Sequence, residues 1–156
     1  MAAAVLFDEP TLAIWELPGL LAIVMRQSPN DAEFAKCREC IKTIAARHQH
    51  FSVLIHIPIF DGPIRASRQA QADFVRSLNA LEGQLTGTAI AITVQGMMGT
   101  MLRLAVNGVL LLGKLHAPIQ LHPTLRASAQ WLQALPNQTV DLRGNVHLAD
   151  EIERLK

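Results

Sequence analysis

Hydrophobic positions are densest between residues 88 and 113, where Arg103 is the only charged side chain. Residues 88–94 are a continuous apolar run with Ile, Val and Thr, which is typical of a parallel strand covered on both faces. A helix is predicted from about residue 98 to 113, because the polar side chains share one narrow stripe: Thr100, Arg103, Asn107 and Lys114. We expect this helix to pack on a sheet. The side of the helix that faces away from the sheet either belongs to the chain's own core or supplies an interface. The second alternative is considered because large exposed apolar patches usually mark interfaces.

The start of the chain predicts a hairpin followed by a helix. Residues 11–26 contain two apolar runs joined at Pro18-Gly19, a dipeptide that favours a turn. Asn30 and Glu33 have the spacing of a capping box, in which each side chain accepts a hydrogen bond from the backbone of the other. We therefore expect an antiparallel hairpin and then a helix that ends near His48 and has one apolar face.

Two more pairs of strand and helix complete the pattern. Residues 51–60 form a second continuous apolar run and predict a central strand that ends near Pro58, because proline cannot donate to a strand ladder. Asp61 is expected to cap the next helix, which ends near Gly83. The last strand and its helix are predicted at residues 117–122 and 123–135.

Residues 136–156 differ in character from the rest of the chain. A polar connection, for which a short strand in residues 139–145 is one interpretation, leads to a one-sided helical pattern of Leu148, Ile152 and Leu155. A helix this short is unstable in isolation, so it must dock on something. Docking on its own domain and docking on another subunit are both open.

The order of these elements predicts the fold class. Strands that alternate with helices favour a mostly parallel sheet with right-handed crossovers. We predict one α/β domain with a five-stranded, mostly parallel sheet, an N-terminal antiparallel hairpin and about four helices. The domain is expected to cover residues 1–135, with residues 136–156 as a C-terminal extension that carries a short amphipathic helix. A chain of 156 residues can bury a sufficient core without disulfides or metal.

Composition and charge argue against several classes of partner. A net charge of +1 gives no general attraction to nucleic acid, and two Trp, five Phe and no Tyr do not provide a base-stacking surface. The Gly and polar residues within residues 88–113 argue against a membrane span. The N-terminus lacks the basic and apolar regions of a secretory signal, so we expect a cytoplasmic protein with reduced cysteines.

The layout of the chain resembles the SpoIIAA-like, or STAS-like, superfamily of bacterial domains. The resemblance covers residues 10–135 and rests on Trp15 with Pro18-Gly19, the apolar residues 53–57, the strand and helix of residues 89–112, and the sequence Ala129-Gln130-Trp131-Leu132. It implies a small α/β sandwich that contacts other proteins in the bacterial cytoplasm, as a signalling or scaffold domain. The superfamily is also related in fold to CRAL-TRIO lipid-transfer domains, which implies a lipid or another apolar ligand as an alternative.

The phosphorylation site of STAS domains is not present in its usual form. Those domains carry an Asp-Ser-Gly type signature after the third strand, where the Ser is phosphorylated to switch partners. This chain has the sequence HIPIFDG at residues 56–62 instead. Ser67 lies downstream and is the alternative phosphate acceptor, although an exposed Ser on a helix is ordinary.

The pair Cys37 and Cys40 forms a C-x-x-C motif within a predicted helix. The pair lies in the third turn, not at the helix N-terminus where the dipole would lower the thiol pKa. For zinc, the nearest His48 is eight residues away, about 12 Å along the helix, whereas zinc holds its ligands within about 2.3 Å. The motif therefore predicts buried structural thiols, with no metal and no cofactor.

His56 is an ionisable residue within an apolar run. It is either a neutral, hydrogen-bonded core histidine or part of a site with Asp61, the one local carboxylate. One imidazole and one carboxylate do not define a reaction. No phosphate-binding loop or nucleophile elbow follows any strand. The sequence therefore predicts a protein that is not an enzyme.

We expect a non-catalytic protein–protein interaction module of bacterial cytoplasm, with a homodimer as one form. The alternative is a carrier that encloses an apolar small molecule or lipid beneath the helix of residues 98–113. An enzyme centred on His56 and Asp61 is a third hypothesis. The candidate interaction residues are Met98, Met101, Arg103, Leu110, Leu148, Ile152 and Leu155, and the candidate polar residues are His56, Asp61 and Ser67.

Overall fold

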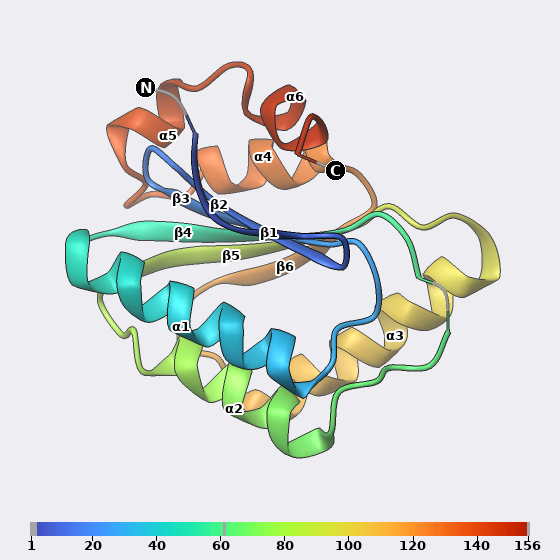
Figure 1. Cartoon of the computed structure of the whole chain (residues 1–156). Helices are drawn as coiled ribbons and strands as arrows, with labels where there is room; N and C mark the ends of the chain where they lie inside the picture. Colours follow the sequence, from blue (N-terminus) through green and yellow to red (C-terminus); the bar gives the residue numbers. More distant parts are fainter. Residues whose placement is uncertain (1–2, 61, 156) are drawn as a thin grey trace.

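A computed structural model describes residues 3–60 and 62–155 of the chain (Figure 1). Six strands form one sheet within these residues, and their order across the sheet is their order along the chain. The second strand is antiparallel to the first and to the third, and the third to sixth strands are parallel to one another. The strands are β1 (Ala4–Glu9), β2 (Leu12–Leu17), β3 (Leu20–Met25), β4 (Phe51–Ile57), β5 (Leu85–Ile92) and β6 (Ile119–His122).

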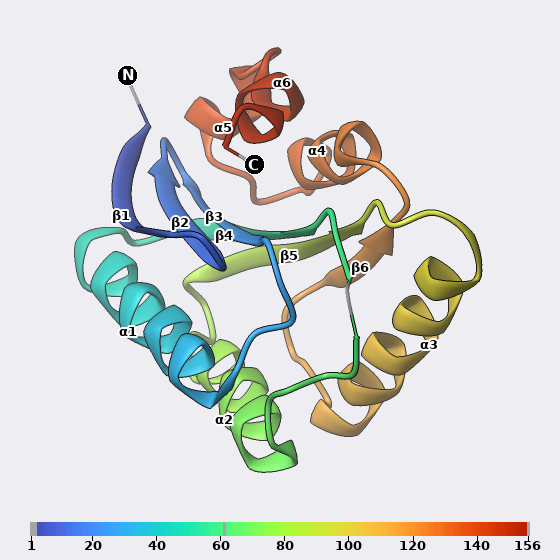
Figure 2. The ribbon, with the colours of Figure 1, turned by 45° about the vertical axis from the view of Figure 1, so that its right-hand side comes forward.

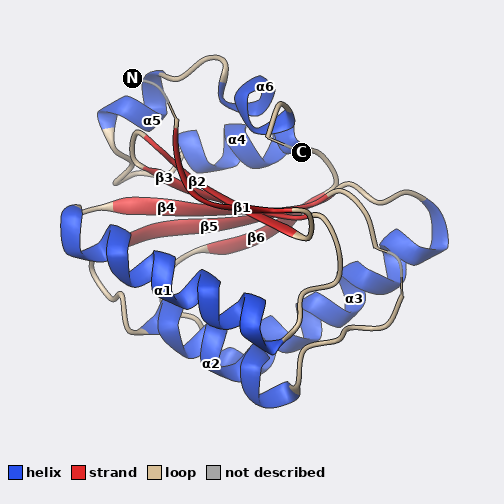
Figure 3. Ribbon diagram, viewed as in Figure 1, coloured by secondary structure: helices blue, strands red, loops and turns tan. Residues whose placement is uncertain are grey.

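Helices cover both faces of the sheet, so that the described residues form three layers (Figures 2 and 3). Three long helices lie on one face, namely α1 (Asp31–Arg47), α2 (Arg68–Asn79) and α3 (Gly96–Gly113). Three shorter helices lie on the other face, namely α4 (Leu125–Gln133), α5 (Val140–Gly144) and α6 (Leu148–Glu153). The α/β class predicted from the alternation of strands and helices is confirmed.

The number of strands and the parallel character of the sheet differ from the prediction. The sheet is mixed and has six strands, because β1 pairs with β2 at one edge. β1 is difficult to detect in the sequence, since it lies at an edge, leaves Val5 exposed and contains a register shift between Val5 and Phe7. The predicted hairpin is confirmed as β2 and β3, with Leu17 opposite Leu20 across the turn.

One helix start and one strand also differ from the prediction. The N-cap of α2 is Ser67, whose Oγ accepts from the backbone N–H of Ala70 at 3.1 Å. The predicted cap, Asp61, lies outside the described residues. The strand predicted in residues 139–145 is wrong, because this segment forms α5, with Thr139 as its N-cap. The capping box of α1 is confirmed, with Asn30 Oδ1 accepting from the Glu33 N–H at 2.9 Å.

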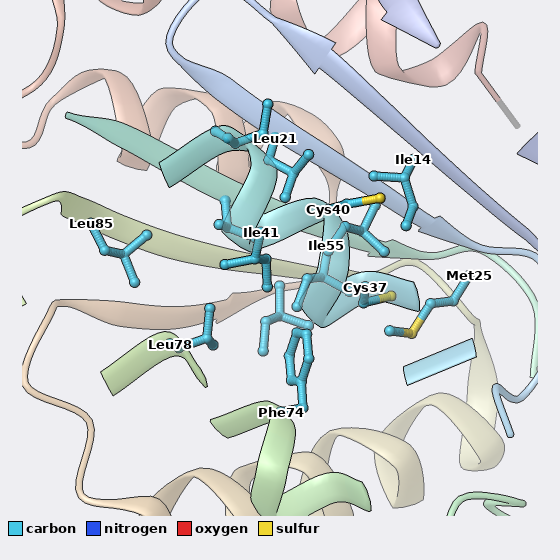
Figure 4. Packing of buried hydrophobic residues seen from close by; sticks show 14 of the residues in the cluster. Ile14, Leu21, Met25, Cys37, Cys40, Ile41, Ile55, Phe74, Leu78 and Leu85 are labelled. Carbon is cyan, nitrogen blue, oxygen red and sulfur yellow. The ribbon is translucent and has the colours of Figure 1, made fainter. Parts of the chain in front are cut away.

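The two faces of the sheet build two separate apolar cores. All six residues of β3 are buried, as expected of a strand with helices on both faces. Ile41 of α1 and Phe74 of α2 belong to the first core (Figure 4). Leu132 of α4 and Ile152 of α6 belong to the second core, together with residues of β3, β4 and β5. The end of the chain therefore contributes to the second core, through Leu142, Leu148 and Ile152.

Candidate functional site

The surface of α3 that faces away from the sheet is apolar. Ten large hydrophobic residues are exposed in the described part of the chain, and five of them lie on α3. Their exposed fractions range from 44% to 79%: Met97, Met98, Met101, Leu104 and Leu111. The opposite side of the helix contains Leu102, which is buried in the first core. We call the five exposed residues the outer face of α3.

A small apolar cavity lies between the inner side of α3 and the sheet. Its volume is about 110 Å³. Leu102, Val106 and Leu110 of α3 line it, together with Ile55 of β4 and Phe74 of α2. Three polar residues also contribute to its wall, namely Gln27, Ser28 and Gln71. α3 therefore faces an apolar cavity on its inner side and exposes apolar side chains on its outer side.

Hydrogen bonds with Ser28 and Asp31 hold one end of the loop between β4 and α2. This loop contributes Ile59 and Ile64 to the cavity wall. Ser28 Oγ donates to the carbonyl oxygen of Pro63 at 3.2 Å. The Asp31 carboxylate accepts from the N–H of Ser67 at 2.7 Å and from its Oγ at 2.8 Å. These bonds from Ser67 lower the pKa of Asp31. The hydroxyl of Ser67, the candidate phosphate acceptor, therefore joins α1 to α2.

A groove separates α3 from β6 at the edge of the sheet. Its volume is about 750 Å³, and residues from both elements line it. Arg103 and Lys114 lie on its α3 side, and Ile119 and Leu121 lie on its β6 side. We call it the α3–β6 groove. In Figure 2, α3 lies beside β6 at the edge of the sheet that is far from β1.

The candidate interaction residues on α3 point in different directions. Met98 and Met101 lie on the outer face. Leu110 is half-buried and lines both the cavity and the groove. Arg103 donates to the carbonyl oxygen of Ile92 at 3.3 Å and to Thr100 Oγ1 at 3.4 Å, so its guanidinium lies close to the start of the helix.

The candidate residues in α6 do not form a free surface. Leu148 and Ile152 are completely or almost completely buried in the second core of the same chain. Of the two docking modes that the sequence left open, these two residues therefore follow the first, because they dock on their own domain. Leu155 is half-buried, and its carbonyl oxygen accepts from Arg26 Nη2 at 3.0 Å.

His56 is fully buried in β4. Its Nε2 lies 3.0 Å from Thr93 Oγ1, a hydrogen-bonding distance. Because side chains alternate along a strand, His56 shares the face of Leu54, which packs in the second core beneath α4. His56 therefore faces away from the cavity and the outer face of α3. Asp61, its proposed catalytic partner, lies outside the described residues.

The cysteines are free and buried, as predicted from their position in the helix (Figure 4). Burial raises the pKa of Cys37 to about 12, and the neighbouring Cys40 adds to this shift. Burial also raises the pKa of Cys40. The described residues contain no cluster of three or more His, Cys, Asp or Glu side chains that could hold a metal ion.

We expect Cys37 to react slowly with iodoacetamide in the folded protein. A pKa rise from 9.0 to about 12 reduces the thiolate fraction at pH 8 about thousandfold, and the thiolate is the reactive form. Reaction should accelerate as the pH rises toward 12 and when urea unfolds the chain. Mass spectrometry of peptides after timed alkylation measures this. Rapid alkylation of Cys37 at pH 8 without urea would contradict the buried position.

Two features of the site could not be recognised along the sequence. The cavity combines residues from the sheet, three helices and two loops, and the groove combines a helix with a strand that follows it. One available signal is the apolar character of Ile59, Phe60 and Ile64, which lie in a loop and would otherwise be expected to be polar. The other is the short strand predicted at residues 117–122, which became β6 at the edge of the sheet.

Comparison with known proteins does not assign this chain to a family. No protein-family model, curated protein or solved structure matches it. Within residues 3–60 and 62–155, no helix has both the length and the apolarity needed to span a bilayer. The functional interpretation therefore depends on the geometry around α3.

Proposed function

We propose that this protein is a non-catalytic protein-interaction module that binds a partner through the outer face of α3. The observation that carries this proposal is the concentration of exposed Met and Leu side chains on one helix. The STAS-like resemblance and the expected cytoplasmic setting, both predicted from the sequence, belong to the same proposal.

The spacing of the exposed residues favours a helical partner. Met97, Met101 and Leu104 follow each other at intervals of four and three, and Leu111 comes seven residues after Leu104. This is the a and d pattern of helices that pack along a shared seam. Gly108 continues the pattern, and a side chain there would meet no atom within 4 Å. A second helix could therefore approach the middle of this seam closely.

The size of the outer face is sufficient for a specific complex. Full burial of a Leu or Met side chain contributes ~1.5–3 kcal/mol. The five residues together could therefore offset much of the ~4–15 kcal/mol that association costs in lost freedom of motion. Methionine is also common on surfaces that adapt to partners, because its side chain is flexible and polarizable. The outer face contains three of the five methionines of the chain.

We expect the double substitution Met97→Asp and Met101→Asp to abolish partner binding without unfolding the domain. Both side chains are more than half exposed, so the carboxylates remain in water when the partner is absent. The measurement compares the proteins that wild type and variant retain from a lysate of the source organism, with quantification by mass spectrometry. The matched control places Asp at Val140 and Val146, which are even more exposed but lie outside α3. Proteins that all three chains retain equally would contradict the proposal.

A second candidate function is the binding of a small apolar ligand, and the cavity beneath α3 favours it. An apolar cavity of about 150 Å³ in another protein stays dry and binds benzene. The cavity here is somewhat smaller, at about 110 Å³. A ligand with a longer chain would require α3 to move away from the sheet.

We expect Val106→Phe to fill the cavity and to eliminate ligand binding. Val106 lines the cavity from α3, and a phenyl ring would occupy most of the free volume. Overpacking of this kind costs ~1–3 kcal/mol at most sites, so the variant should still fold. NMR titration with benzene and with decanoate measures binding, and native mass spectrometry detects any apolar mass that copurifies. The control is Val146→Phe, at an exposed position between α5 and α6 on the other face of the sheet. Equal titration curves for wild type and Val106→Phe would exclude this cavity as the binding site.

A further inference from the structure

The two edges of the sheet are protected to different degrees. β1 carries Asp8 and Glu9 and has a register shift, and charges and bulges both discourage pairing with a further strand. β6 has the sequence IQLH, pairs with β5 in regular register and is the last strand of the sheet. Its outer side therefore has no strand partner among the described residues. An edge of this kind is a template for an added strand.

α3 leaves room for such a strand. The α3–β6 groove has a volume of about 750 Å³, within the range of ligand sites in proteins. Its floor includes Ile119 and Leu121 of β6, and its wall includes Leu104 and Leu111 of α3. Main-chain bonds to β6 would hold the backbone of a bound peptide, and the leucines would contact every second side chain.

The charges that line the groove are positive. Arg103 and Lys114 both line it, and no described Asp or Glu side chain does. Neither cation forms an ion pair within the described part of the chain, and Lys114 is exposed. The other polar residues of the lining are neutral, namely Thr100, Asn107 and Gln120. A bound segment that carries carboxylates would complement this charge.

We infer that the α3–β6 groove binds an acidic peptide segment in extended conformation, which pairs with β6 as an additional strand. The inference rests on the proposed protein-interaction function, for which it names the chemistry of the partner and the mode of binding. The apolar lining selects alternate Val, Ile or Leu side chains, and the two cations select Asp or Glu. Leu104 and Leu111 belong to the groove and to the outer face, so one partner can occupy both surfaces.

Charge and shape make two other occupants less suitable. A second copy that paired edge to edge through a two-fold axis would bring a second Arg103 and Lys114 to the same interface, and like charges would repel. A bilayer surface presents no backbone N–H or C=O groups to the edge of a strand. The acidic peptide matches both the open strand and the positive lining.

The test selects peptides from a displayed random decapeptide library on the folded full-length chain. We expect the enriched peptides to contain Asp or Glu between β-branched residues and to lack Pro. Lys114→Glu should weaken their binding about tenfold, because it reverses one of the two charges. Lys42→Glu, an exposed substitution on α1 with the same change in net charge, should have no effect. N-methylation of the peptide at alternate amides should abolish binding in one register and be tolerated in the other.

Each contrary result identifies what fails. Enriched peptides without acidic residues, equal effects of Lys114→Glu and Lys42→Glu, or tolerance of N-methyl groups in both registers would overturn the inference. Peptides that lose binding with Met97→Asp and Met101→Asp but not with Lys114→Glu would overturn it and leave the proposed function intact. A dimer that Lys114→Glu strengthens would assign the groove to a second copy. If no peptide is enriched and the lysate comparison shows no difference, both proposals fail.

Discussion

Replacing Ile152 by Ala is expected to lower the free energy of unfolding by about 3 kcal/mol, within the range of ~2–5 kcal/mol for a fully buried aliphatic residue. Ile152 has no exposed surface and packs in the second core with Leu132, Leu142 and Leu148. The substitution removes three buried carbon atoms and leaves a cavity beneath α6. Urea unfolding measures the change, with Trp15 and Trp131, the two tryptophans of the chain and both packed against this core, as fluorescent probes.

Leu155→Ala is the matched control for this prediction. Leu155 follows α6 and is only half-buried, so its truncation should cost less than about 1 kcal/mol. Equal effects of the two substitutions, or a separate early transition, would show that α6 is not part of the same cooperative unit. A single transition would instead show that residues 136–156 are integral to the domain. The bonds from Gln138 Nε2 to Ser52 Oγ at 2.9 Å and to the Leu132 carbonyl oxygen at 2.8 Å favour that result.

Much of the fold could be predicted because local signals and tertiary structure agree. The continuous apolar runs became β4 and β5, which are buried between two layers of helices. The capping box at Asn30 specified the start of α1. Pro58 follows the last residue of β4, as expected from its missing N–H. In these elements the sequence pattern within a few residues determines the structure.

The structure differs from the sequence predictions where tertiary contacts determine the local conformation. Residues 139–145 contain too few apolar positions to show a period, and Leu142 is helical because α5 places it in the second core. Asp61 has the sequence context of a cap, but Ser67 caps α2, and its contact with Asp31 joins two segments 36 residues apart. A pattern in sequence carries no information about such a distant partner.

The candidate site was predictable in part, where the local sequence pattern agrees with the structure. The periodicity of residues 98–113 indicated a helix that is apolar on nearly all sides, and the outer face of α3 is the exposed part of that surface. The pattern of Leu148 and Ile152 is similar, yet both residues are buried in the second core of the same chain. Amphipathic spacing shows that a helix must pack on something. It does not show whether the partner belongs to the same chain.

The substitution Gly99→Ala should displace the start of α3. Alanine at a helical position normally stabilises a protein by ~0.5–1 kcal/mol relative to glycine. At Gly99, however, the added methyl group would overlap the carbonyl oxygen of Val94, in the connection between β5 and α3. We expect a net loss of ~1–3 kcal/mol, as for other overpacked sites. Because α3 forms a wall of both the cavity and the groove, ligand and peptide binding should also weaken.

Gly108→Ala is the control on the same helix. A methyl group at Gly108 would have no neighbour within 4 Å, so the helix propensity of alanine should act alone and stabilise the domain. Thermal unfolding of both variants, together with proton–nitrogen NMR spectra, distinguishes a local displacement of α3 from a global loss of structure. Shifts confined to residues near Val94 and along α3 would support the displacement. Equal stabilisation by the two substitutions would mean that α3 does not begin against Val94, and the walls of the cavity and of the α3–β6 groove would then have to be reassigned.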